Sequence, residues 1–272
     1  MKPKHLTLLF LSVFISCSGM RGVYDGERAS MVKRSQREQV ILTDSLIANL
    51  PAPIQKHLRV CGYVGSPVPF NCEIIWRESF LKLKPENDWG QLDTEQFNSV
   101  NPIGRISFMK FHSMPLKGRD IYLDGYGEMK GKLLDLITVV EGSGPETSQS
   151  AMITSFAEFP FIPGYLLQNY IEFHALDSNT VEATLTEGGM TVVGIYHFND
   201  EGFYSKFETS DRFYADPDGS FRKVPYTINI MSYQNQSGIM IPDSLNAVWN
   251  LPGGNFEYFK GRLKGLDFNV SE

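Results

Sequence analysis

In this 272-residue chain, the residues that could perform chemistry are carboxylates. The sequence contains neither a nucleophile motif nor a cluster of metal ligands. The sequence has no G-x-S-x-G elbow; Gly142, Ser143 and Gly144 come closest, with the wrong spacing. The four histidines beyond residue 17 stand alone, without an H-x-H or H-E-x-x-H pair, and no glycine loop is followed by Lys-Ser or Lys-Thr. The sequence therefore predicts neither a metal site nor a phosphate loop, and no cofactor is expected.

Glu158 is the most informative carboxylate because it lies in the apolar segment FAEFPFIP. Such surroundings either raise the pKa of a carboxyl group or require it to be paired. Arg119, which precedes Asp120, and Arg212 are candidate partners for such a pair. Glu158 then either forms a structural ion pair that holds a helix to a sheet or, with Arg119, Asp120 or Arg212, acts as the carboxylate of a hydrolase.

Aromatic residues are the other candidates for a site, because they lie on predicted strands or in the apolar loop after Glu158. Alternation along strands places many of them on one concave face, where they form either an ordinary core or the lining of a cavity. The candidate ligand-binding residues are Arg119, Asp120, Tyr122, Tyr126, Glu158, Phe161, Tyr196, Arg212, Trp249 and Tyr258.

The first seventeen residues predict a secretory signal that ends in a lipid attachment site. Lys2 and Lys4 precede an apolar run of ten residues, which is about half the length needed to span a bilayer. Ser16 and Cys17 follow this run and resemble the bacterial lipobox, although Phe14 replaces the usual Leu. This resemblance implies cleavage after residue 16 and acylation of Cys17, and several acyl chains would hold the protein on a membrane.

Composition limits the possible partners. The chain has 31 acidic and 25 basic residues, and loss of Lys2 and Lys4 changes the net charge from −6 to −8. An acidic protein is poorly suited to bind nucleic acid. We expect the membrane, through acylated Cys17, and a lipid-like ligand as partners, and a periplasm-facing position in the bacterial envelope.

The fold class follows from hydrophobic patterns after residue 69. Ten segments have β-branched and aromatic enrichment with partial alternation: 71–80, 105–112, 119–126, 128–136, 180–186, 190–198, 203–214, 222–233, 239–251 and 255–268. Short turn signals between them, such as Asp124-Gly125, indicate antiparallel neighbours. We predict a mostly β, α+β fold in which one large curved antiparallel sheet, barrel-like or a half-barrel, is covered by a few helices.

Helices are expected at three places in the chain. Thr43 or Asp44 caps the first of two short helices, and Gly62 follows the second. Residues 149–159 form another helix, which Pro160 ends. The predicted organisation is a signal peptide at 1–16, a lipid-anchored tether at 17–42 that becomes helical late, and a single β-rich domain at 43–272. The spacing leaves open whether Cys61 and Cys72 form a disulfide.

Segments such as LPAPIQKHLRVCGYVGSP, FAEFPFIPGYLL and GIMIPDSLNAVWNLPGGNFEYFKGRL resemble a bacterial family known only as a domain of unknown function. The resemblance covers about residues 50–268. Where relatives have a Trp-x-Pro-Phe stretch, this chain has Trp89-Gly90-Gln91-Leu92. The matching positions are Arg119, Asp120, Tyr122, Asp124, Gly125, Gly127, Met129, Glu158, Pro163, Arg212, Pro242, Trp249, Phe256 and Tyr258. The expected architecture also looks like the lipoprotein-carrier half-barrels of the bacterial envelope.

Together these features predict a membrane-anchored envelope lipoprotein, non-enzymatic, that binds a hydrophobic or amphipathic ligand. An interaction module for another envelope protein and a carboxylate-based envelope hydrolase are the alternatives. An interaction module predicts an exposed apolar patch on the convex face; a hydrolase predicts that Glu158 faces an open cleft.

Overall fold

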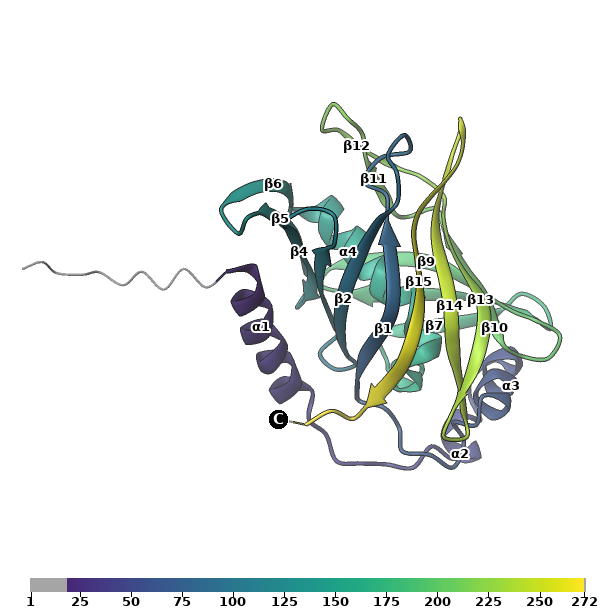
Figure 1. Ribbon diagram of the computed structural model, residues 1–272. Helices are drawn as coiled ribbons and strands as arrows, with labels where there is room; N and C mark the ends of the chain where they lie inside the picture. The colour runs from purple at the N-terminus through teal and green to yellow at the C-terminus, as the bar shows by residue number, and fades with distance from the viewer. Residues whose placement is uncertain (1–18, 272) are drawn as a thin grey trace, which may run out of the picture.

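A computed structural model describes residues 19–271 and shows a single 13-stranded antiparallel sheet (Figure 1). From one edge to the other the order is β6-β5-β4-β3-β2-β1-β15-β14-β13-β10-β9-β8-β7. The strands of this sheet are β1 (Asn71–Leu81), β2 (Gly90–Ser99), β3 (Gly104–Phe111), β4 (Leu116–Leu123), β5 (Tyr126–Leu133), β6 (Ile137–Gly142), β7 (Ile171–Ala175), β8 (Thr180–Glu187), β9 (Met190–Phe198), β10 (Tyr204–Thr209), β13 (Tyr226–Gln236), β14 (Ile239–Leu251) and β15 (Gly254–Phe268). A separate hairpin consists of β11 (Phe213–Ala215) and β12 (Phe221–Lys223).

The predicted fold class is confirmed, and the sheet is wider than the ten predicted segments. The segments 203–214 and 222–233 each divide into two strands, and β2, β6 and β7 were not predicted. Strand β2 was missed because its sequence, GQLDTEQFNS, is mostly polar on both faces. Its inward-facing Gln96 and Asn98 are buried and hydrogen-bond to the chain's interior ion cluster, so apolar alternation is replaced there by buried polar contacts.

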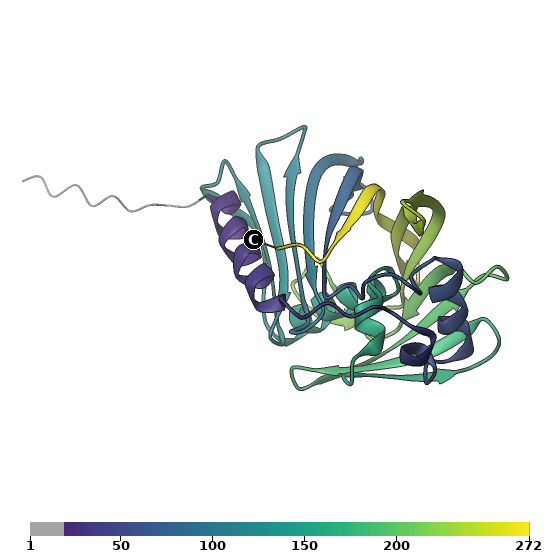
Figure 2. The same ribbon diagram turned by 90° about the horizontal axis from the view of Figure 1, so that it is seen from below.

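The sheet curls around a helix, α4 (Pro145–Ala157), which lies inside the curve (Figure 2). Helix α4 packs against β4, β5 and β9. Gly127 permits the close approach, because a Cβ atom at this position would lie 2.7 Å from Cα of Ser148. The Gly127 N–H donates to Oγ of Ser148 at 2.9 Å. The predicted helix at 149–159 is thus confirmed, with its start four residues earlier and its end two residues earlier.

The prediction of a tether is wrong for most of residues 17–42. Helix α1 (Met20–Ser35) packs on the outer face of β2, β3 and β4 with Met20, Tyr24, Met31 and Val32 buried. Four ion pairs also join it to the sheet, for example Arg28 to Glu73 at 2.6 Å and Glu27 to Arg119 at 2.9 Å. The sequence suggested a solvated segment because its apolar residues are few and its charges many, yet these charges pair with charges on the sheet.

The remaining helices connect α1 to β1 and the end of α4 to β7. They are α2 (Asp44–Ile47), α3 (Ala52–Val60) and two short 3₁₀ helices, η1 (Phe159–Phe161) and η2 (Pro163–Leu167). Thr43 caps α2 as predicted, since its hydroxyl accepts from the Leu46 N–H at 3.3 Å. Cys61 and Cys72 are both buried and unpaired thiols.

Candidate functional site

A cavity of about 160 Å³, here called the central cavity, lies between the concave face of the sheet and the end of α4. Residues at alternate positions of several strands line it, as the two-residue period of a strand requires: Ile74 and Trp76 on β1, Gln96 and Thr94 on β2, and Arg105 and Ser107 on β3. The cavity therefore occupies the inner face of the sheet, with polar groups toward β2–β4 and apolar groups toward β13–β15.

The apolar wall of the cavity includes Ile74, Trp76, Ile228, Leu245, Ala247, Phe259 and Leu263. The Trp76 indole meets the Phe259 ring edge to face, with 5.3 Å between centroids. Gly261 makes room for this indole, because a Cβ atom there would lie 2.5 Å from a ring carbon. Nε1 of Trp76 is buried and has no hydrogen-bond partner within the described residues. The wall is thus apolar apart from one unused donor.

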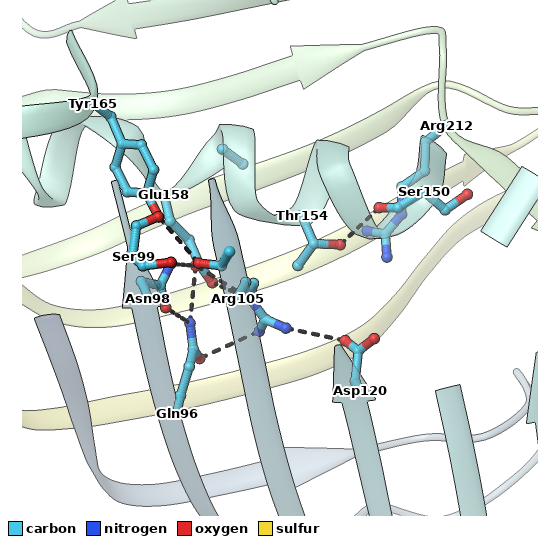
Figure 3. Close-up of polar contacts among 12 residues, drawn as sticks. Gln96, Asn98, Ser99, Arg105, Asp120, Ser150, Thr154, Glu158, Tyr165 and Arg212 are labelled. Carbon is cyan, nitrogen blue, oxygen red and sulfur yellow. Dashed lines mark hydrogen bonds and ion pairs between the residues drawn. The ribbon is translucent and has the colours of Figure 1, made fainter. Parts of the chain in front are cut away.

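The polar end of the cavity is an ion cluster centred on Glu158 (Figure 3). Nε of Arg105 lies 3.1 Å from Oε1 and 3.2 Å from Oε2 of Glu158, and Nη1 of Arg105 donates to Asp120 at 3.0 Å. Gln96 and Asn98 donate to Oε2 of Glu158 at 2.9 and 2.8 Å. Four contacts from three side chains therefore engage the carboxylate of Glu158, and the Glu158 side chain is 10% exposed.

Neither candidate partner, Arg119 or Arg212, pairs with Glu158; its partner is Arg105. Arg119 points to the outer face of the sheet, where it pairs with Glu27 of α1 and Glu128 of β5. Arg119 and Asp120 are consecutive in a strand, so their side chains must lie on opposite faces. Asp120, on the inner face, lies within reach of Arg105 from the neighbouring strand.

Arg212 lines the same cavity but is held by aromatic rings and not by a carboxylate. Its guanidinium carbon lies 4.0 Å from the centroid of Tyr226, 4.9 Å from that of Trp249 and 5.8 Å from that of Tyr258. Nη1 donates to the Tyr258 hydroxyl at 3.1 Å, whereas Nε is buried without a partner. Arg105 uses its donors on Glu158, Asp120 and Gln96, so Arg212 is the lining cation with spare donors.

Cavity size restricts what the central cavity can hold. A cavity of about 150 Å³ lined by apolar side chains binds a molecule the size of benzene. At about 160 Å³, the central cavity suits a segment of one acyl chain or another narrow apolar group. An acceptor group at the end of such a chain would find Arg212 and Trp76 as donors.

The other candidate residues divide between the cavity and the rest of the interior. Asp120, Glu158, Phe161, Arg212 and Tyr258 line the cavity. Trp249 does not line the cavity but packs beside Arg212, which does. The residues that lie away from the cavity are Arg119, Tyr122, Tyr126 and Tyr196. Tyr122 donates to Glu187, and Tyr126 is half exposed at a turn. Tyr196 is buried in the core and donates to the Phe156 carbonyl.

Sequence reasoning missed Arg105 and Gln96 as parts of the site. Residues 105–112 were predicted as a strand, and alternation in a strand puts Arg105 and Ser107 on the same face. This alternation was the sequence signal that could have placed Arg105 in the site. For Gln96 there was no signal, because β2 itself was not predicted.

Two further findings concern the described residues as a group. Residues 19–271 contain no cluster of three or more His, Cys, Asp or Glu side chains arranged to bind a metal ion. Within the same residues, no helix has the length and apolar character needed to cross a membrane. Cys17 lies outside the described residues.

These features define a protein built from one curved antiparallel sheet that encloses a helix and a mostly apolar cavity with a polar end. The chain belongs to a family of unknown function, DUF6544, whose model matches residues 40–261. The resemblance to a domain of unknown function is thus confirmed. No curated protein matches the sequence.

Three solved structures are similar to this chain at low sequence identity. A domain assigned to outer membrane lipoprotein sorting, from Vibrio parahaemolyticus, is 12% identical, with a TM-score of 0.42 and coverage of 74% of this chain and 86% of that one. A DUF1329 family protein from Desulfovibrio piger is 12% identical, with a TM-score of 0.43 and coverage of 81% and 93%. A LolA superfamily protein from Nitrosomonas europaea is 10% identical, with a TM-score of 0.43 and coverage of 86% and 96%.

Proposed function

We propose that this protein is a non-enzymatic envelope lipoprotein, anchored through acylated Cys17 and facing the periplasm, that holds the apolar chain of an amphipathic ligand in the central cavity. The observation that carries the proposal is the division of the cavity into an apolar wall and a polar end where Arg212 has spare donors. A ligand with one apolar chain and an acceptor head group matches both parts.

The apolar wall can supply useful affinity by itself. Burial of each methylene group contributes about 0.8 kcal/mol. Five or six methylenes in contact with the wall would contribute about 4–5 kcal/mol, which corresponds to a dissociation constant near 1 mM or below. Pairing of the head group with Arg212 would strengthen this and would orient the ligand, because hydrogen bonds to charged groups contribute about 1.5–3 kcal/mol.

The contacts of Glu158 favour a structural role over hydrolysis. A catalytic carboxylate must be able to reach the proton or the atom on which it acts. Arg105, Gln96 and Asn98 already occupy the Glu158 carboxylate, and these contacts join the end of α4 to β2 and β3. The group therefore holds the polar end of the cavity in place.

Ala247→Phe is expected to abolish occupancy of the cavity. Ala247 is a buried residue of β14 that lines the apolar wall, and a phenyl ring there would fill the space that the ligand needs. Cells that express the full chain would be fed a clickable palmitic acid bearing a diazirine. We expect light-dependent cross-links on cavity peptides of the wild type and their loss in Ala247→Phe.

Met231→Phe is the matched control because it adds a ring on the neighbouring strand β13 at a residue that is 65% exposed. It should retain the cross-links, and thermal unfolding should show that both variants are folded. Absence of light-dependent cross-links on wild-type cavity peptides would reject ligand binding.

Cys17→Ala is expected to remove the anchor. The same palmitate probe should label the peptide that begins at Cys17 without light, because acylation is a covalent modification. Mass spectrometry of the purified chain should find this label in the wild type and not in Cys17→Ala, which should also leave the membrane fraction. Label that persists in Cys17→Ala would contradict acylation at this residue.

A further inference from the structure

Three turns of the sheet lie at the same end of the molecule. Strands β1 to β6 are consecutive and antiparallel, so the turns 82–89, 112–115 and 134–136 must emerge at one end, and the intervening turns at the other (Figure 1). The Leu134 N–H donates to the Pro115 carbonyl at 2.8 Å, which joins two of these turns directly.

Large apolar side chains are exposed on these turns and at the first residue of β6. We call them the apolar turn surface, and they are Leu83, Met114, Leu134, Leu136 and Ile137, with exposed fractions of 51%, 42%, 60%, 80% and 58%. Single exposed apolar residues are ordinary, but several gathered at one end of a protein mark a contact surface. Leu134 and Asp135 both have positive φ, 56° and 59°, at positions where Asn and Gly are the usual residues. The turn therefore presents Leu134 despite the local backbone preference.

The described chain begins beside the same turn. The Met20 N–H donates to Oδ1 of Asp135 at 3.1 Å, so the start of α1 is fixed next to Leu134 and Leu136. Cys17 comes two positions before Gly19 in the sequence, and two residue steps span at most about 7 Å. An acyl group on Cys17 must therefore attach to the chain close to the apolar turn surface.

We propose that the apolar turn surface is the face that contacts the lipid bilayer, with Leu134 and Leu136 immersed beside the acyl chains of Cys17. This inference rests on the anchor of the proposed function. Contact would depend on apolar burial more than on charge, because the mature chain has 31 acidic and 23 basic residues once Lys2 and Lys4 are removed. A zwitterionic bilayer should therefore suffice.

This orientation also directs the cavity toward the membrane. Leu81 ends β1 and Met109 lies near the end of β3, both at the end that carries the apolar turn surface, and both line the central cavity. Lipid molecules would then be the nearest source of an apolar chain for the cavity. The anchor, the immersed turns and the cavity would work at one surface.

The test uses Leu136→Cys in the full acylated chain, with an environment-sensitive fluorophore on the new thiol. Burial raises the pKa of Cys61 to about 12 and that of Cys72 well above its usual value, so these buried thiols should not react. After reconstitution in phosphatidylcholine vesicles, we expect a several-fold rise in emission at position 136 and quenching by spin-labelled lipids. Leu46→Cys, on α2 at the opposite end, should show neither effect (Figure 1).

Flotation of the vesicles reports the anchor separately from the turn. A chain that floats while its label at position 136 stays in water would overturn the proposed face and leave the anchor intact. A chain that does not float would refute the anchor and this orientation with it. A rise in emission that disappears when the protein is diluted within the vesicles would also overturn the proposal, because it would show that a second copy of the chain covers the surface.

Discussion

Stability is expected to fall by about 3 kcal/mol between pH 7 and pH 4 because His57 is buried in its neutral form. His57, in α3, is 1% exposed. In the neutral tautomer with the proton on Nε2, Nδ1 accepts from the Tyr204 N–H and Nε2 donates to the Pro160 carbonyl, both at 3.2 Å. Protonation at Nδ1 would exchange the bond from Tyr204 for one to the Gly202 carbonyl, which lies 3.2 Å away, and would place a charge among buried aromatic rings.

The direction of the effect follows from the two pKa values. Burial lowers the pKa of His57 from 6.5 to about 4 in the folded protein. Below pH 6.5 the unfolded chain binds a proton that the folded chain does not, so unfolding becomes easier. The stability that neutral His57 contributes is fully present above pH 6.5 and is lost as the pH falls to 4. At about 1.4 kcal/mol for each unit of pKa, the loss is about 3 kcal/mol.

Urea denaturation at pH values from 4 to 7 would measure this dependence. His57→Gln should lower stability at pH 7 and should flatten the slope between pH 4.5 and 6.5, because the titrating group is gone. His112→Gln is the control, since His112 is exposed and hydrogen-bonds to Asp93 at 2.7 Å. Equal slopes in the wild type and His57→Gln would show that another group causes the acid sensitivity.

The sequence predicted those parts of the fold that local rules determine. The Asp124-Gly125 turn joins β4 to β5 as predicted, and both residues have positive φ. Strand β2 escaped prediction because buried amides replace apolar residues on its inner face, and only the position of Glu158 in the fold explains them. Helix α1 escaped for a similar reason, since its charges are satisfied by strands that are distant in sequence.

The candidate site shows the same limit. The apolar sequence around Glu158 correctly indicated that this residue is buried and paired. Its partner could not be identified from the sequence, because strand register determines which side chains meet. Arg105 on β3 lies opposite Tyr122 on β4, and Asp120 is the next residue of β4 on the same inner face. Alternation alone would have excluded Arg119, whose neighbour Asp120 occupies the inner face.

Glu158→Leu is expected to lower the free energy of unfolding by about 3–5 kcal/mol. Removal of one member of a buried ion pair usually costs about 3–5 kcal/mol, because the remaining charge loses its compensation. Arg105 would keep Asp120 as a partner but would lose both contacts to Glu158, and Gln96 and Asn98 would lose an acceptor. Glu158→Gln should cost less, about 1.5–3 kcal/mol, because one acceptor oxygen remains.

The double variant Glu158→Leu with Arg105→Met separates the worth of the pair from the cost of an unpaired charge. Replacement of a whole buried pair by apolar residues of similar size is often neutral. We therefore expect the double variant to be more stable than Glu158→Leu alone, measured by urea denaturation, although Asp120 then relies on water, which its 25% side-chain exposure permits. If the two losses simply add, Arg105 and Glu158 contribute independently, and the polar end of the cavity is not held by their pairing.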